Sequence, residues 1–195
     1  NVPEHNWEAF DKFIQNTKEF AGVPYKMAVE EKGKGIQSSF LKLIIKVRPK
    51  IVADGLDDST FNPSDTGAYA TAEDVNNMID RGVTVIDMRN MYEAAIGHFE
   101  NAKLMNVDTF REQLAKVTDM FKDKKDEEVL LYCTGGIRCE KASAWMKHNG
   151  FKNVKHIKGG IIDYAHQVKA KGLQNKLSEN LMTLGREAGE YWKEG

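Results

Sequence analysis

The chain has 195 residues, 41% of them apolar, and a formal net charge of -1. This length suits one full domain and a smaller piece, and the apolar content is enough for an ordinary core. The most apolar run, FLKLIIKV, is interrupted by Lys42 and Lys46, and no run approaches the roughly 18 apolar residues that a membrane helix needs. No signal peptide opens the chain, so we expect a cytoplasmic protein without membrane association.

The first predicted element is a helix that Asn6 caps, with an apolar face that continues to Phe20. Its apolar positions are Trp7, Phe10, Phe13, Ile14 and Phe20. A strand is expected over residues 40–47, so residues 1–50 have the pattern of a partial α+β module. Residues 51–68 are acidic and contain Pro63, which indicates a linker.

Residues 69–173 alternate between predicted helices and strands. Thr71 caps a helix with Asp74 at the capping-box position, and a second helix begins near Thr109. The remaining elements, in chain order, are the strand VTVIDMR before that second helix, then the strand VLLYC, a helix that ends at Gly150, the strand VKHIKGG and a helix over residues 161–171. This alternation predicts an α/β fold, a parallel sheet with helices on both faces. Residues 174–195 are expected to contain one more helix, over residues 178–192, that needs a partner surface.

The stretch VLLYCTGGIRCE places Cys133 directly after a buried strand and just before a helix. Backbone N–H groups of residues 134–138 and the positive end of the helix dipole would favour the thiolate form of this cysteine. Gly135 and Gly136 allow the loop to curl with its N–H groups inward. We therefore predict that Cys133 is a nucleophile in a loop that consists of Thr134, Gly135, Gly136 and Ile137.

The length of this loop bears on the group that it can hold. Four residues separate Cys133 from Arg138, whereas cysteine-based phosphatases place five residues between their cysteine and arginine. The shorter ring suits a smaller group, such as one extra sulfur atom, or the bare cysteine. A phosphatase is therefore the least favoured of the enzyme classes that use such a loop.

The two cysteines and the charge pattern limit other functions. Cys133 and Cys139 lie six positions apart, which favours a catalytic or redox role over a disulfide framework. The five histidines are scattered and no paired CxxC occurs, so we expect no metal and no cofactor. Residues 138–176 hold nine cationic and two acidic side chains, a net charge of +7. Such a segment either binds a polyanion or forms solvated helix faces, and charge alone favours the second interpretation.

Several longer motifs resemble the rhodanese family. DMRNMYEAAIGHFENA (87–102) resembles its D-x-R-x-x-x-E-x-x-x-G-H-I-x-x-A signature, and GFKNVKHIKGGIIDY (150–164) resembles its closing strand and double-glycine turn. Together with IVADGLDD, DTFREQ and CTGGIRCEKASAWMKHNGF, residues 41–173 resemble the rhodanese-containing tRNA uridine hydroxylases, which modify the wobble uridine. Residues 6–47 resemble the end of the ferredoxin-like domain that precedes the rhodanese domain in that family. The cysteine-rich tail of the family has no counterpart here.

The resemblance implies hydroxylation of uridine C5 with molecular oxygen, on the anticodon loop of tRNA, without a known metal or flavin. Our mechanistic hypothesis is that the Cys133 thiolate adds to C6 of the uracil ring and so activates C5. Two alternatives stay open: a sulfurtransferase in which Cys133 carries a persulfide, and a non-catalytic RNA-binding module. The sequence leaves open which tRNAs are used and what oligomeric state the protein has.

Other residues are expected to support the loop. Arg138 either orients an anionic intermediate or anchors the loop through its carbonyl groups. Asp87 and Arg89 are expected to form an ion pair that braces the sheet end, and Glu93 is given a similar role. Cys139 is interpreted as a packed side chain, with a redox partnership with the nucleophile as the alternative.

Overall fold

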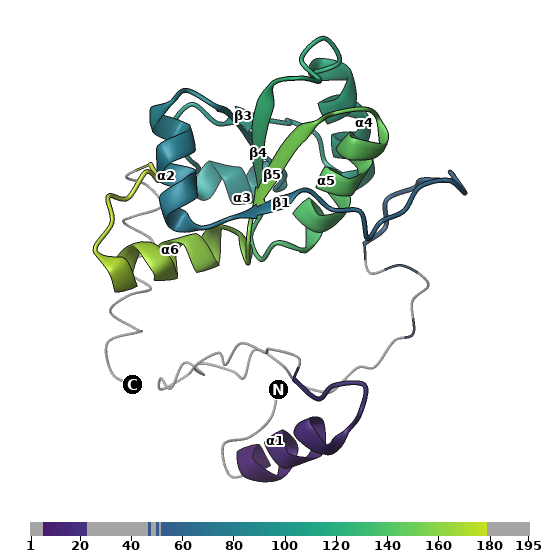
Figure 1. Cartoon of the computed structure of the whole chain (residues 1–195), viewed down its shortest axis with the longest axis vertical. Helices are drawn as coiled ribbons and strands as arrows, with labels where there is room; N and C mark the ends of the chain where they lie inside the picture. Colours follow the sequence, from purple (N-terminus) through teal and green to yellow (C-terminus); the bar gives the residue numbers. More distant parts are fainter. Residues whose placement is uncertain (1–5, 23–46, 48–49, 51, 179–195) are drawn as a thin grey trace. The chain divides into compact units, whose positions relative to one another are not determined.

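The computed structural model describes residues 6–22, 47, 50 and 52–178 (Figure 1). The chain divides into two compact units, residues 50–189 and residues 1–49 with 190–195. The described helix of the smaller unit, α1 (Trp7–Asn16), begins after Asn6 as predicted, while Phe20 lies in the turn beyond it. The predicted strand 40–47 and the predicted helix 178–192 lie outside the described residues, apart from Val47 and Ser178.

The larger unit contains a five-stranded sheet in which every pair of neighbouring strands is parallel. Its spatial order is β1-β5-β4-β2-β3. The strands are β1 (Ala68–Ala70), β2 (Thr84–Asp87), β3 (Lys103–Leu104), β4 (Glu128–Tyr132) and β5 (Asn153–Ile157). The predicted α/β fold is thus confirmed, and β1 and β3 are short edge strands that the sequence did not predict.

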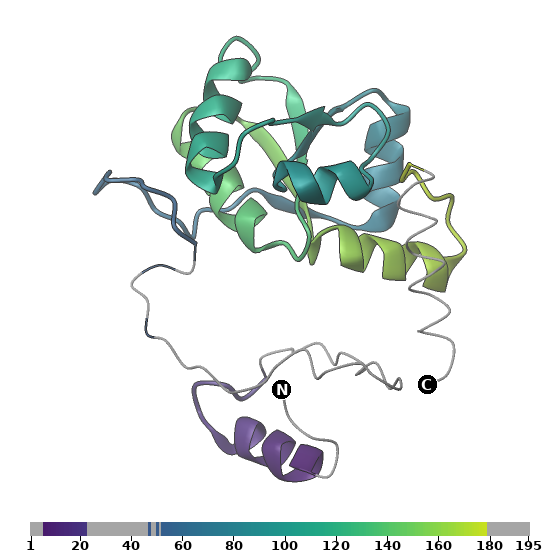
Figure 2. The ribbon, with the colours of Figure 1, turned by 180° about the vertical axis from the view of Figure 1, so that it is seen from behind.

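Helices cover both faces of this sheet (Figures 1 and 2). One face carries α4 (Phe110–Met120) and α5 (Ile137–His148), and the other carries α2 (Ala72–Asp80) and α6 (Gly160–Lys171). These four helices lie where they were predicted, and α2 and α4 begin at the capping boxes of Thr71 and Thr109. A short helix that was not predicted, α3 (Met91–Ile96), follows β2. No helix in the described part of the chain is long and apolar enough to cross a membrane.

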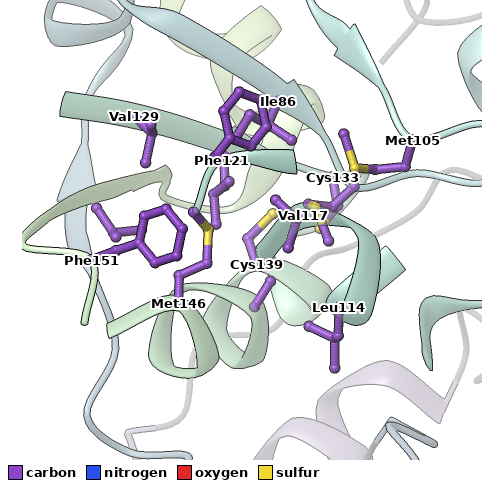
Figure 3. Packing of buried hydrophobic residues seen from close by; sticks show 14 of the residues in the cluster. Ile86, Met105, Leu114, Val117, Phe121, Val129, Cys133, Cys139, Met146 and Phe151 are labelled. Atoms are coloured by element: carbon purple, nitrogen blue, oxygen red, sulfur yellow. The ribbon is translucent and has the colours of Figure 1, made fainter. Parts of the chain in front are cut away.

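The alternation of side chains along β4 decides which face receives the cysteine. Val129 and Leu131 pack into the core beneath α4 and α5, whereas Leu130 and Tyr132 pack into the core beneath α2 and α6. Cys133 lies on the same face of the sheet as Val129 and Leu131, and it belongs to the same core cluster as Cys139 of α5 (Figure 3). The strand period therefore directs the thiol towards the first turn of the next helix.

The segment after α6 contacts the loop that follows α3. Leu177 forms an isolated antiparallel bridge with Phe99, and Ser178 donates its backbone N–H to the His98 carbonyl at 2.9 Å. The segment 174–195 was predicted to contain a helix. Its first residues pack against the loop that follows α3.

Candidate active site

Cys133 and Asp87 lie at the same level of the sheet, at the carboxyl ends of two neighbouring strands. Cys133 directly follows β4, Asp87 ends β2, and these two strands are neighbours. From β4 the chain continues to β5 on one side, and from β2 it continues to β3 on the other side. Ligands of open parallel sheets bind where the strand order reverses in this way, outside the carboxyl ends of the strands. The predicted nucleophile therefore occupies the expected ligand-binding position of the fold.

The environment of Cys133 stabilises a thiolate. Hydrogen bonds from the Cys139 thiol and backbone N–H, together with the nearby Arg138 charge, lower the pKa of Cys133 to about 6 although burial opposes this. The Gly136 N–H also donates to Cys133 Sγ at 3.1 Å. Gly136 precedes α5 and has a φ of +97°, a conformation that a glycine adopts at low cost. Of the predicted donors in residues 134–138, the Gly136 N–H bonds to the sulfur, and Cys139, which lies just beyond them, is a further donor.

Arg138 anchors the loop through side chains. Anchoring through the carbonyl groups of the loop was one of the two roles that the sequence predicted. Its guanidinium forms two 2.7 Å hydrogen bonds with Glu93 and donates to Thr134 Oγ1 at 3.1 Å. Thr134 in turn donates to Glu93 at 2.5 Å. Hydrogen bonding from Arg138 lowers the pKa of Glu93 to about 2, so this carboxylate stays charged near neutral pH. The three side chains tie the loop to α3, and the catalytic role of Arg138 stays a prediction.

Asp87 and Arg89 form a buried ion pair beneath this arrangement, as the sequence suggested. The Arg89 guanidinium contacts both carboxylate oxygens, with a shortest N–O distance of 2.7 Å, and donates to the Gly97 carbonyl at 2.6 Å. Tyr132 donates its hydroxyl to Asp87 at 2.6 Å, and burial together with the Asp87 charge raises the pKa of this tyrosine. The network joins β2 to β4 and orients the loop after α3.

The turn between β5 and α6 supports the reactive loop from behind. Gly160 has a φ of +69°, and a Cβ at this position would lie 2.4 Å from the Thr134 carbonyl oxygen and 2.5 Å from that of Cys133. The next residue, Ile161, donates its N–H to the Cys133 carbonyl at 2.9 Å. The turn between β5 and α6 is therefore packed directly against the backbone that carries the thiol.

A small cavity lies beside this site at the carboxyl ends of β2 and β3. It has a volume of about 170 Å³ and is lined by Asp87, Arg89, Met91, Ala94, Ala95, His98, Leu104, Met105 and Asn106. Met105 also belongs to the core cluster of Cys133, and Figure 3 shows the two side chains close together. The thiol itself is almost fully buried, whereas Gly135 and Ile137 of the loop above it are exposed. The exposed side of the site is therefore this loop.

The positive segment 138–176 does not form a continuous basic surface. Six of its eight lysines form ion pairs with acidic residues from other parts of the chain. These lysines are Lys141, Lys147, Lys152, Lys155, Lys171 and Lys176. The interpretation as solvated helix faces therefore fits better than a polyanion patch.

Some contributors to the site were missed in the sequence. Tyr132 looked like an ordinary strand residue, and Gln113, whose side chain donates to the Arg89 carbonyl at 2.9 Å, looked like a polar helix position. Helix α3 had a readable signal, because Asn90 and Glu93 have capping-box spacing and the Asn90 N–H donates to Glu93 at 3.0 Å. The contacts of Tyr132 and Gln113 depend on strand neighbours that a single sequence does not reveal.

Comparison with known proteins matches the central part of the chain to a family model. Residues 71–167 match the family model described as "Rhodanese-like domain". A crystal structure of a rhodanese-like domain protein from Staphylococcus aureus is 24% identical in sequence, with a TM-score of 0.41, and the match covers 50% of this chain and 90% of that chain.

Two relatives carry the name tRNA uridine(34) hydroxylase. The one from Leptospira interrogans is 47% identical over 188 residues, which cover 95% of this chain and 50% of the relative. The one from Photorhabdus laumondii is 51% identical over 175 residues, which cover 89% of this chain and 49% of the relative. The chain thus spans about half the length of the curated relatives it matches. With the parallel sheet and the cysteine loop, residues 71–167 of this chain form a rhodanese-like domain.

Proposed function

We propose that this chain is the rhodanese part of a tRNA-modifying enzyme that hydroxylates uridine 34, with Cys133 as the nucleophile. The observation that carries the proposal is the Cys133 thiolate, held at the strand-order reversal with a pKa of about 6. The names of the relatives from Leptospira interrogans and Photorhabdus laumondii support the choice of substrate and reaction. The proposed compartment is the cytoplasm, where tRNA is modified.

In the proposed mechanism, the Cys133 thiolate adds to C6 of the uracil ring. The addition turns C5 into an enolate-like carbon that reacts with molecular oxygen, which is covalent activation of an otherwise unreactive position. The Arg138, Glu93 and Thr134 contacts hold the loop so that the sulfur keeps one position during the attack. A base in the single-stranded anticodon loop can leave its stack to reach the sulfur, which a base in a duplex does only at a cost.

The decisive test is nucleoside analysis of tRNA from cells that lack the protein. Wild-type protein is expected to restore 5-hydroxyuridine at position 34, and Cys133→Ala is expected to restore none. Equal restoration by both proteins would contradict the proposal and favour a binding module.

Trapping with RNA that contains 5-fluorouridine tests the adduct, because the mechanism requires a covalent bond between Cys133 and the base.

A sulfurtransferase is the second candidate, since the rhodanese-like fold and the four-residue loop suit a persulfide on Cys133. Thiosulfate treatment followed by mass spectrometry separates the two functions. A sulfurtransferase would gain the mass of one sulfur atom on Cys133 and turn over with cyanide. We expect no cyanide-dependent turnover from this protein.

A further inference from the structure

Cys133 and Cys139 form a buried pair of free thiols at the candidate active site. Cys139 lies in the first turn of α5, is fully buried and donates hydrogen bonds to Cys133 Sγ from both its thiol and its backbone N–H. Figure 3 shows both side chains in one apolar cluster, one from the end of β4 and one from the start of α5. A neutral thiol that is hydrogen-bonded to a neighbouring thiolate is an arrangement from which a disulfide can form on oxidation.

Hydroxylation with molecular oxygen has an electron requirement that this pair can meet. Inserting one oxygen atom into the C5–H bond of uridine removes two electrons from the base. Reduction of O₂ to one hydroxyl oxygen and one water takes four electrons, so two electrons and two protons must come from elsewhere. Conversion of two thiols into a disulfide releases two electrons and two protons.

We propose that Cys133 and Cys139 supply these two electrons, which makes Cys139 a second catalytic residue. The inference rests on the proposed function. In total, one uridine, one O₂ and two thiols become one 5-hydroxyuridine, one water and one Cys133–Cys139 disulfide. An external dithiol then reduces the disulfide by thiol exchange and prepares the protein for the next turnover.

The steps follow from the position of each sulfur. After Cys133 adds to C6, O₂ forms a bond with C5 and gives a hydroperoxide. The O–O bond breaks when the outer oxygen passes to the Cys139 sulfur as a sulfenic acid, which leaves a hydroxyl group on C5. Loss of the C5 proton restores the ring double bond and expels the Cys133 thiolate. This thiolate attacks the Cys139 sulfur and releases hydroxide, which takes up the proton to give water.

The burial of Cys139 suits this role. Burial, and then the neighbouring Cys133, raise the pKa of Cys139 well above its ordinary value, so it stays a neutral thiol while Cys133 is ionised. A protonated thiol with no access to solvent is protected from oxidants in solution and reacts only with the hydroperoxide formed on the base that the neighbouring Cys133 holds. The two cysteines thus differ in charge and in access, as a nucleophile and its reductant should.

The test is a single-turnover reaction of reduced protein after removal of the reductant. We expect at most one 5-hydroxyuridine per protein molecule from a tRNA transcript with uridine 34, and one Cys133–Cys139 disulfide per product by peptide mass spectrometry. No disulfide is expected without oxygen or without tRNA, and dithiothreitol should restore repeated turnover. Product that accumulates while both cysteines stay reduced would overturn the inference.

Cys139→Ser provides the matched variant, because its hydroxyl keeps the size and the hydrogen-bond donor of the thiol. Its first-turnover product is expected to fall at least tenfold while iodoacetamide still modifies Cys133, which shows that the fold and nucleophile are intact. Undiminished product from Cys139→Ser would overturn the role of Cys139 but would leave the proposed function intact. Absence of product from wild-type protein in air with dithiothreitol overturns the proposed function as well. Failure of diamide to join the two cysteines in tRNA-free protein also overturns the inference.

Discussion

Cys133 owes its reactivity to a few short contacts. Burial in an apolar cluster would by itself keep the thiol protonated, yet hydrogen bonds from Cys139 and Gly136 and the charge of Arg138 reverse the balance. The sequence predicted a thiolate from the loop and the helix dipole. It did not predict that the second cysteine is the largest contributor, because that contact depends on how the first turn of α5 is placed.

The ionisation of Cys133 should be visible in its alkylation rate. Because the pKa lies at about 6, the thiolate fraction should rise between pH 5 and 7 and stay constant above that range, whereas an ordinary thiol would gain reactivity up to pH 9. Mass-resolved labelling with iodoacetamide across this range measures the midpoint. Cys133→Ser serves as the control, since only the slow reaction of buried Cys139 should remain. A midpoint above pH 8 would refute the assigned environment.

Glu93 should contribute to stability in a pH-dependent way. Its pKa falls from an ordinary value of 4.5 to about 2 in the folded chain, so its contribution is present above pH 4.5 and is lost as the pH falls towards 2. Glu93→Gln leaves the half-buried Arg138 without its ion pair and should cost about 2 kcal/mol at pH 7. Urea unfolding at pH 7 and pH 3 checks the prediction.

The control for this variant is Glu100→Gln, which changes an exposed carboxylate that forms no ion pair with the residues that the structure describes. It should alter the free energy of unfolding by less than about 0.5 kcal/mol at either pH. If Glu93→Gln costs as much at pH 3 as at pH 7, the loss is one of packing rather than of charge.

At the scale of elements, helix starts were the most predictable feature. Thr71 and Thr109 each form a capping box in the structure, and α2 and α4 begin where these boxes were predicted. The edge strands β1 and β3 have three and two residues, which is too short to show a period of two. The contacts that support the reactive loop could not be predicted from the sequence, because Glu93 and Arg138 are 45 positions apart.

The turn between β5 and α6 should tolerate no side chain at Gly160. A Cβ there would lie 2.4 Å from the Thr134 carbonyl oxygen, so Gly160→Ala must displace either α6 or the reactive loop. We expect a loss of stability of about 3 kcal/mol, from a strained φ and a backbone clash together. We also expect at least a tenfold change in the rate of Cys133 alkylation at pH 7.

Gly82→Ala separates these two causes. Gly82 has a similar φ of +75°, but a Cβ there would meet no atom within 4 Å. This variant should lose only about 1 kcal/mol, from the unfavourable φ, and should keep the wild-type alkylation rate. Equal behaviour of the two variants would mean that the turn does not support the loop.

At the scale of the molecule, both core clusters and all five strands belong to the unit of residues 50–189. The resemblance predicted this rhodanese-like sheet, and the charge pattern alone favoured solvated helix faces over a polyanion-binding patch. Residues 138–176 are strongly positive in the sequence, yet acidic residues from elsewhere in the chain neutralise most of their lysines. The interpretation as solvated helix faces fits this arrangement, but the particular ion pairs could not be predicted, because they join residues far apart in the sequence.

A fragment of residues 50–189 should therefore fold by itself. Its two cores and the contacts of Cys133 are all internal to this unit, so it should unfold cooperatively in urea and alkylate with the same midpoint near pH 6 as the whole chain. Circular dichroism and iodoacetamide labelling of the fragment beside the whole chain test this. A broad transition, or a midpoint shifted towards pH 9, would mean that residues 1–49 help to hold the reactive loop. The same midpoint would locate everything that ionises Cys133 in the rhodanese-like unit.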